Sequence, residues 1–353
     1  MPPQPIPFFS RRHVLVSASA ALSVIACTNK NAREISHSSL KNKGQWSTTP
    51  SLPRAVQEIY PCAHQGRLHL AGGFIATEGR ISGPTAGHHS WSPGEDAWRV
   101  ETPLPTARHH PHMVSFQDRL LAIAGFESPS ADTAWTIQKT GWALSENGKS
   151  WRNIAALPAP VAEAVTGLTG DGYLHIAGGR SWAAENQTGQ WQDHIDTDHH
   201  FVLADINGDW DRAAPCPHKR NSAAGAVIDG QLHIVGGRQV GGGNLAHHTV
   251  YDYKEDKWRT LAPMPQAQGG LAAAALGGKL YAFGGEFFDN GGGVYAQSWV
   301  YDPATDSWDA LPDMPNPRHG LGAVALEGRI YVIGGALKAG GFETSDLVEV
   351  FGA

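Results

Sequence analysis

The sequence predicts an all-β fold, a propeller of six four-stranded blades, because two residue patterns recur together. A pair of glycines recurs five times, and a changed copy, Ala124-Gly125, stands where a sixth is due. A tryptophan stands 27 or 28 residues before the second glycine of each copy, and 21 to 31 residues separate that glycine from the next tryptophan. Repeats of about 50 residues are typical of propellers and solenoids. The glycine pairs are Gly72-Gly73, Gly178-Gly179, Gly236-Gly237, Gly284-Gly285 and Gly334-Gly335, and the tryptophans are Trp46, Trp98, Trp151, Trp210, Trp258 and Trp308.

Each repeat contains four segments with the pattern of a β-strand. A short apolar run ends at the glycine pair, as in residues 67–71. A turn such as Asp229-Gly230 precedes that run, and a strand of small residues, such as 271–276, precedes the turn. Small side chains fit where strands crowd toward an axis. A third strand, such as 250–252, and then the tryptophan strand complete the unit.

The two ends of the repeat region predict how the propeller closes. The last repeat reaches its third strand at residues 347–351 and lacks a tryptophan strand of its own. A surplus tryptophan, Trp46, precedes the first glycine pair. We therefore expect the segment around Trp46, residues 45–52, to supply the outer strand of the last blade, which removes exposed sheet edges.

The repeat resembles that of the kelch β-propeller family. The matching features are the glycine pairs, the tryptophans, a tyrosine or histidine four residues before the second glycine, the run Tyr301-Asp302-Pro303 and the pairs Met264-Pro265 and Met314-Pro315. The resemblance covers about residues 44–353 and implies a six-bladed kelch propeller, but it says little about function. The second repeat departs from the pattern at Leu121 and Ala124, so we expect weaker packing in that blade.

Residues 1–26 have the pattern of an export signal. The run Ser10-Arg11-Arg12 precedes an uncharged apolar stretch, residues 14–26, that is too short to span a membrane. The paired arginines resemble a twin-arginine signal, and an ordinary export signal with two incidental arginines is the alternative.

Cys27 follows Ala26 as the lipidated cysteine of a bacterial lipoprotein does, and plain cleavage after Ala26 is the alternative. Residues 27–43 are polar and would serve as a tether before the propeller, residues 44–353. The sequence thus predicts a protein of the periplasm or cell envelope, in contact with a membrane only through a lipid on Cys27.

The composition of the chain limits the kinds of partner that we expect. The chain has 27 Lys and Arg against 33 Asp and Glu, a formal net charge of −6, and it has no basic patch or aromatic RNA motif. We therefore expect no nucleic-acid partner. Cys62 and Cys216 fall in different repeats, and we expect them to remain unpaired.

The part of the repeat that varies in length, between the second glycine and the next tryptophan, predicts the face that carries function. We call it the elastic part. It contains the loop between the second and third strands, which lies on the same face as the crossing between blades. Insertions therefore gather on one face, and a small ligand would bind where the axial funnel opens there.

Polar residues recur at the predicted crossings and after the glycine pairs. Arg108, Arg220 and Arg318 stand ten residues after a tryptophan, and Arg54 stands eight residues after Trp46. Either they bond backbone carbonyls between blades, or they form a cationic funnel mouth that holds a carboxylate. The further candidates for ligand binding are His109, His110, Glu163, Arg180, Asn221, Arg238 and His319.

Glu286 follows a glycine pair directly, and it is the candidate general base. Bacterial sialic-acid mutarotases resemble this chain, since they are exported six-bladed kelch propellers with a catalytic glutamate at that position. The resemblance implies that Glu286 is the catalytic residue and that Arg318 matches a carboxylate-binding arginine. However, Phe287-Phe288-Asp289 stands where that family has basic residues.

The 18 histidines do not predict a metal site. Each of the pairs His88-His89, His199-His200 and His247-His248 begins a third strand, where neighbouring side chains point to opposite faces. His69, His175 and His233 occupy the position that Tyr281 and Tyr331 hold in other repeats, so we interpret them as structural. We expect neither a metal nor another cofactor.

These observations predict an exported propeller that binds an anionic small molecule, a carbohydrate by preference, in its axial funnel. Whether it also isomerises that ligand, as a mutarotase or epimerase does, stays open. A non-catalytic platform for protein–protein contacts in the cell envelope is the alternative.

Overall fold

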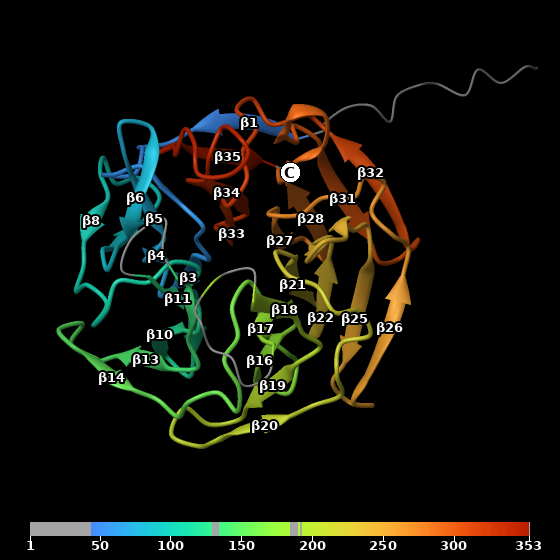
Figure 1. Cartoon of the computed structure of the whole chain (residues 1–353), viewed down its shortest axis with the longest axis horizontal. Coiled ribbons are helices and arrows are strands. Elements are labelled where there is room, and N and C mark those ends of the chain that lie inside the picture. Colours follow the sequence, from blue (N-terminus) through green and yellow to red (C-terminus); the bar gives the residue numbers. More distant parts are fainter. Residues whose placement is uncertain (1–43, 129–133, 184–189, 191–192, 353) are drawn as a thin grey trace, which may run out of the picture. The chain divides into compact units, whose positions relative to one another are not determined.

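Six four-stranded antiparallel sheets lie around a common axis in the described residues, which are 44–128, 134–183, 190 and 193–352 (Figure 1). The structure is a computed structural model. The predicted signal peptide, the tether and Cys27 lie outside the described residues. Within the described ranges, no helix is long and apolar enough to cross a membrane.

The strands of each sheet follow one another outward from the axis. The innermost strands are β3 (Cys62–His64), β9 (His112–Phe116), β15 (Val165–Leu168), β21 (Ala224–Ile228), β27 (Ala272–Leu276) and β33 (Gly322–Leu326). The second strands are β4 (Arg67–Ala71), β10 (Arg119–Ile123), β16 (Leu174–Ala177), β22 (Gln231–Val235), β28 (Lys279–Phe283) and β34 (Arg329–Ile333). The third strands are β7 (His88–Trp91), β13 (Gly141–Leu144), β19 (His200–Leu203), β25 (His248–Asp252), β31 (Ser298–Asp302) and β35 (Val348–Gly352).

The outer strands are β8 (Arg99–Val100), β14 (Trp151–Asn153), β20 (Trp210–Arg212), β26 (Lys257–Leu261), β32 (Ser307–Leu311) and β1 (Gln45–Thr48). The last of these confirms the predicted closure. Strand β1 pairs antiparallel with β35, and Trp46 lies opposite Phe351. The N-terminal strand of the described chain thus covers the edge that the C-terminal strand would otherwise expose.

A closed set of indole hydrogen bonds helps to explain why each tryptophan stands at a nearly constant distance before its glycine pair. Each indole Nε1 donates to a carbonyl in the neighbouring repeat, four residues after that repeat's own tryptophan. The bonds run from Trp98 to Pro50, Trp151 to Thr102, Trp210 to Ala155, Trp258 to Ala214, Trp308 to Ala262 and Trp46 to Pro312, at 2.9–3.2 Å. An insertion between tryptophan and crossing would break this bond, so this part of the repeat keeps its length.

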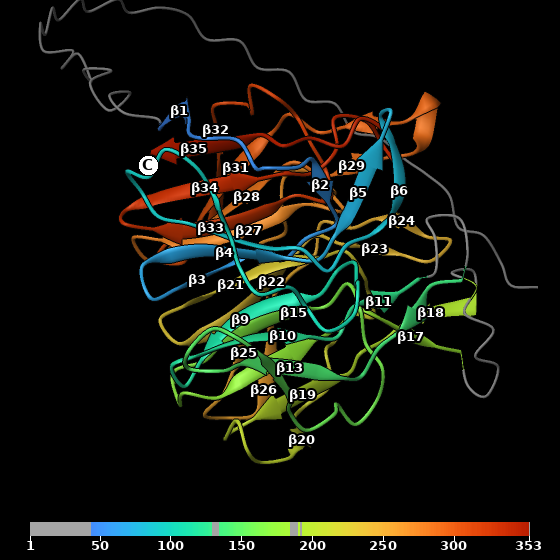
Figure 2. The same ribbon diagram turned by 90° about the vertical axis from the view of Figure 1, so that its left-hand side faces the viewer.

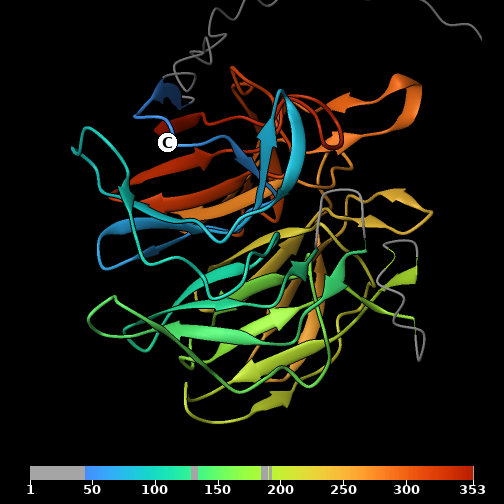
Figure 3. The ribbon, with the colours of Figure 1, turned by 60° about the vertical axis from the view of Figure 1, so that its left-hand side comes forward.

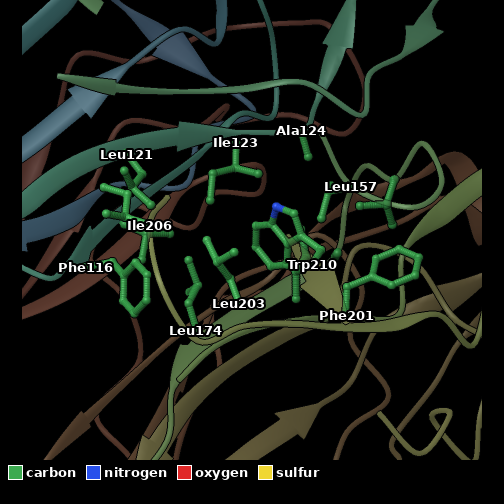
Figure 4. Packing of buried hydrophobic residues seen from close by; sticks show 14 of the residues in the cluster. Phe116, Leu121, Ile123, Ala124, Leu157, Leu174, Phe201, Leu203, Ile206 and Trp210 are labelled. Atoms are coloured by element: carbon green, nitrogen blue, oxygen red, sulfur yellow. The ribbon is translucent and has the colours of Figure 1, made fainter. Parts of the chain in front are cut away.

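Apolar side chains fill the spaces between neighbouring sheets. Between the second and third sheets, Leu121 and Ile123 of β10 pack in one cluster with Leu174 and Phe201 (Figure 4). Full burial of such a side chain contributes about 1.5–3 kcal/mol. Ala124 takes a φ of 61° at the position where the other repeats have glycine. The second sheet therefore keeps the shared backbone at some cost in strain.

Buried histidine pairs support the structural interpretation of His69, His175 and His233. The Nδ1 atom of each lies 2.8–3.0 Å from the Nε2 atom of a histidine at the start of the third strand, namely His88, His200 and His248. Where the second strand has tyrosine instead, as in Tyr281 and Tyr331, the third strand begins with Ser298 or Val348. The space between the second and third strands is therefore filled either by two histidines or by a tyrosine together with a serine or valine.

The elastic segments build small sheets on one side of the four-stranded sheets, as predicted (Figures 2 and 3), and strand β2 of the crossing joins the first of them. They are β2 (Val56–Gln57), β5 (Phe74–Thr77) and β6 (Arg80–Pro84); β11 (Phe126–Glu127) and β12 (Thr136–Ile137); β17 (Arg180–Trp182) and β18 (His194–Asp196); β23 (Arg238–Gln239) and β24 (Gly243–Asn244); and β29 (Glu286–Phe287) and β30 (Gly293–Val294), with the 3₁₀ turn η2 (Asp289–Gly291). Cys62 and Cys216 are free thiols.

Candidate functional site

The crossings between sheets form a ring of residues in the left-handed backbone conformation. Each residue stands twelve positions after a tryptophan, and its φ lies between 48° and 70°. Backbone N–H groups of this ring donate to carbonyls of neighbouring ring residues, as Glu58 does to Gly320 at 2.7 Å and His110 does to Glu58 at 2.9 Å. The ring residues are Glu58, His110, Glu163, Ser222, Gly270 and Gly320. A non-glycine residue in this conformation costs about 1–3 kcal/mol, and four of the six carry polar side chains.

A second repeated contact brings side chains that follow the glycine pairs next to this ring. The residue before each ring position bridges to the residue directly after the glycine pair, for example Asn221 to Arg238 and Gly269 to Glu286. The two positions together place charged groups around the axis. We call the resulting set the axial polar cluster: Glu58, His110, Glu163, Arg180, Asn221, Ser222, Arg238, Glu286 and His319.

On one side of the cluster, Glu286 accepts two hydrogen bonds, and a histidine lies close to it. Arg238 Nη2 lies 2.7 Å from its Oε1 atom, and the backbone N–H of Gly340 donates to its Oε2 atom at 2.8 Å. His319 Nδ1 lies 3.4 Å from the same Oε2 atom, and His319 Nε2 faces the carbonyl oxygens of Lys338 and Gly340, each at 3.0 Å. Glu286 therefore reaches the cluster, with both oxygens engaged.

On another side, Glu163 forms a buried ion pair. Arg180 Nε lies 3.2 Å from its carboxylate, and the Ser222 hydroxyl donates to the same group. The Asn221 amide donates to Asp196 on β18. These bonds connect the crossings to the small sheets above them.

Glu58 is oriented by two histidines. Its Oε2 atom lies 2.7 Å from His110 Nε2, and His110 Nδ1 lies 2.7 Å from His109 Nδ1. The His109 ring stacks on Phe74 and Phe126, with ring centroids 3.9 and 4.8 Å away. His109 thus supports the cluster from an aromatic pocket.

Neighbouring charges keep Glu58, Glu163 and Arg238 ionised. Burial alone would raise the pKa of Glu58, but His110 and His319 outweigh it and lower that pKa to about 2. Burial also opposes ionisation of Glu163, yet Arg180 and His110 lower its pKa. Burial would lower the pKa of Arg238, but Glu286 and Glu163 raise it.

Three of the predicted funnel arginines are elsewhere, so their assignment to the funnel mouth is wrong. Arg108, Arg220 and Arg318 are at most 3 % exposed and lie inside the sheets. Each guanidinium donates to the carbonyl at the first glycine position of its repeat, namely Ala124, Gly236 or Gly334. These carbonyls lie where the chain leaves the sheet and have no ladder partner, so the arginine satisfies them. This is the carbonyl-bonding alternative raised from the sequence.

Arg54 also lies away from the cluster. It is exposed, and its charge lowers the pKa of His89 after the larger effect of burial. The ten-residue spacing of the other repeats leads from Trp46 to Val56, not to Arg54. Two residues further on stands Glu58, which the sequence analysis missed, as it missed Ser222. The constant spacing after each tryptophan was the signal that identifies both.

Several atoms of the region are buried without a hydrogen-bond partner. They are Arg238 Nε, His319 Nδ1, His109 Nε2, His112 Nε2 and both amide atoms of Gln57. Such atoms are rare in proteins, and a ligand is one way to satisfy them. Among the described side chains, no group of three or more His, Cys, Asp or Glu is arranged to hold a metal ion.

An axial cavity of about 290 Å³ lies among the innermost strands of all six sheets. Its walls are small residues such as Ala224 and Gly225, and Tyr60 and His112 stack in its wall at 4.3 Å. None of the cluster side chains lines it. Glu58 and Ser222 line a second pocket of about 10 Å³, which shares Tyr60, Leu271 and Leu321 with the axial cavity.

Comparison with known proteins identifies the architecture. The solved structure titled "Structure of YjhT" superposes with a TM-score of 0.70 over 85 % of this chain and 96 % of that chain, at 15 % sequence identity. Residues 187–350 match the family model described as the KLHDC2/KLHL20/DRC7 Kelch-repeats domain. The fold is that of a β-propeller, and residues 187–350 of it match kelch repeats.

Two curated kelch proteins are similar to this propeller over part of their length. Kelch-like protein 35 of Mus musculus is 32 % identical over 143 residues, which are 40 % of this chain and 22 % of that protein. Kelch-like protein terF of Aspergillus terreus (strain NIH 2624 / FGSC A1156) is 25 % identical over 199 residues, 55 % of this chain and 41 % of that protein. The chain thus spans less than half the length of the curated relatives it matches.

Proposed function

We propose that this propeller binds an acidic carbohydrate at the axial polar cluster. The observation that carries the proposal is Arg238. Its side chain is 17 % exposed, one guanidinium nitrogen holds Glu286, and its Nε–H is buried without a partner. An arginine side chain that keeps exposed surface is suited to bind a ligand carboxylate through its guanidinium.

The rest of the cluster suits the hydroxyl groups of a sugar. A hydroxyl both donates and accepts, so a sugar needs acceptors and donors side by side. The carboxylates of Glu58, Glu163 and Glu286 are acceptors, and the guanidinium of Arg180 and the amide of Asn221 are donors. Convergence of a few polar groups of both kinds is typical of small-molecule sites.

Catalysis by Glu286 is the finer part of the proposal. The resemblance to sialic-acid mutarotases supports exchange of sugar anomers, with Glu286 as the general base. In this structure Glu286 accepts from Arg238 and Gly340, so a substrate hydroxyl would have to replace one of these donors. The pattern of residues 1–26 supports placing the activity in the periplasm or cell envelope.

The test measures binding of D-glucuronate, D-galacturonate, N-acetylneuraminate and neutral D-glucose by saturation-transfer NMR and calorimetry. We expect an acidic sugar to bind the wild type, and Arg238→Met to weaken that binding about 10- to 100-fold, because a charge-assisted hydrogen bond contributes about 1.5–3 kcal/mol. Binding of the neutral sugar should change little. Arg54→Met is the control.

Equal affinity of Arg238→Met and wild type for every acidic sugar would contradict the proposed anchor. Anomer exchange of the bound sugar, followed by NMR, tests the finer part: Glu286→Gln should abolish it. Retained exchange would exclude Glu286 as the base.

A protein-interaction platform is the second candidate, and two aromatic side chains favour it. Phe288, on the β29–β30 hairpin, is 62 % exposed, and Phe342 is 48 % exposed. If no sugar binds, this face is better explained by a protein partner. A Phe288→Ser/Phe342→Ser variant should then lose a partner that Arg238→Met retains.

A further inference from the structure

Glu58 stands where the backbone makes a glutamate unfavourable. At the same ring position the fifth and sixth crossings have Gly270 and Gly320, which adopt positive φ without a Cβ penalty. Glu58 has a φ of 59°. Strained residues that carry polar side chains at a site are candidates for function, because the surrounding structure has to hold them there.

The surrounding residues hold the carboxylate in one place. A Cβ atom on Gly320 would lie 2.8 Å from Glu58 Oε1, so the carboxylate fills the space that this glycine leaves. The histidine chain described above fixes Oε2 through His110 Nε2 at 2.7 Å. The other oxygen, Oε1, has His319 Nδ1 at 3.6 Å, beyond hydrogen-bond distance.

Glu58 is also the most accessible charged group of the cluster. Its side chain is 21 % exposed, more than Arg238 at 17 % or Arg180 at 11 %. Glu286 is 4 % exposed. Glu58 Oε1 can therefore accept a hydrogen bond from a ligand hydroxyl without losing one that it already makes.

We infer that Glu58 is the residue that binds ligand hydroxyls, accepting through Oε1, while Arg238 takes the ligand's acidic group. This rests on the proposed function. An ionised carboxylate with one oxygen already oriented gives strong, directed hydrogen bonds to hydroxyl donors. His110 and His109 are positioning residues, since they act on the ligand only through the Glu58 carboxylate. The ligand class is thus a hydroxy acid, with a hydroxyl bound by Glu58 and the carboxylate bound by Arg238.

The test compares Glu58→Gln with the wild type for binding of D-glucuronate, D-galacturonate and their singly deoxygenated derivatives, by calorimetry. We expect about 10- to 100-fold weaker binding, because glutamine keeps the acceptor for His110 but loses the charge. One deoxygenated derivative should lose the same factor on the wild type and nothing further on Glu58→Gln. The matched control is Glu78→Gln, since Glu78 is an exposed glutamate with φ of 51° in the turn between β5 and β6.

The outcomes separate this inference from the proposed function. If neither sugar acid binds the wild type, both are overturned. If the wild type binds and Glu58→Gln binds equally well, only the role of Glu58 is overturned. Circular dichroism and the unfolding midpoint check that the variant folds. If it does not, Glu58→Asp takes its place, because it keeps the charge but withdraws the carboxylate by one methylene and should also weaken binding.

Discussion

Arginine occupies two kinds of position in this propeller, and the local backbone decides what each one does. Arg220, two residues before the ring position, turns into the sheet and donates to the carbonyls of Gly236, His247 and Ile234. Arg238, directly after the glycine pair, turns toward the axis and pairs with Glu286. The same side chain therefore stabilises the fold at one position and belongs to the candidate site at the other.

Arg318→Met should destabilise the protein without a specific effect on ligand binding. The substitution leaves Glu349, which is 1 % exposed, as a buried and unpaired carboxylate, and it leaves the Gly334 carbonyl without its donor. Breaking such a pair costs about 3–5 kcal/mol. Urea unfolding measures the loss, with Arg54→Met as the control that changes stability by less than about 0.5 kcal/mol. A stable Arg318→Met variant that fails to bind ligand would restore this arginine to the site.

At the scale of the single sheet, the buried histidine pairs make stability depend on pH. Burial lowers the pKa of His233 from its ordinary 6.5 to about 4, and burial together with His233 lowers that of His248 to about 3. Below pH 6.5 the unfolded chain therefore binds protons that the folded chain does not. The free energy of unfolding should fall as the pH drops from about 6.5 toward 4.

Replacing one pair by its natural alternative should reduce this dependence. His233→Tyr with His248→Ser reproduces the combination of Tyr281 and Ser298 in the next sheet. Between pH 7 and pH 5 the double variant should lose on the order of 4 kcal/mol less stability than the wild type, about 2 kcal/mol for each histidine removed. Urea unfolding at both pH values measures the difference. An identical pH dependence would show that these histidines are not protonated on unfolding.

At the scale of the whole molecule, the chain closes on itself through β1. Trp46 donates to Pro312 and packs against Phe283 and Phe351, with ring centroids 5.5 and 5.1 Å away. The same strand covers the edge of β35. Closure therefore depends on one short strand that is remote in sequence from its partners.

A chain that begins at residue 49 should be less stable and prone to associate. It loses the Trp46 contacts, at a cost of at least about 3 kcal/mol, and it exposes the β35 edge to pairing with another molecule. The matched control begins at residue 44 and keeps β1. Thermal unfolding and light scattering after size exclusion compare the two. If the two chains have equal melting temperatures and are both monomers, the pairing of β1 with β35 is not important for closure.

Much of the fold could be predicted because its signals are local and repeated. The glycine pairs end strands because they adopt positive φ. The indole bonds require a constant distance from each tryptophan to the crossing that follows it. The candidate site was predicted only in part. Arg238, Glu286 and Glu163 were identified from their positions next to glycine pairs and crossings, whereas Glu58 was missed because Arg54 was counted in a register two residues too early.

The sequence by itself determined the four-stranded repeat, the closing strand and the face with the elastic loops, since each follows from spacing along the chain. Only the tertiary structure decided which charged side chains meet. Each crossing contains one residue with a left-handed φ, and the residues just before it have different partners: Arg220 bonds inside its sheet, whereas Asn221 bonds Asp196 on a small sheet. Their partners, such as the Gly334 carbonyl for Arg318 and His110 for Glu58, are chosen by packing between segments far apart in sequence, and spacing alone carries no information about that choice.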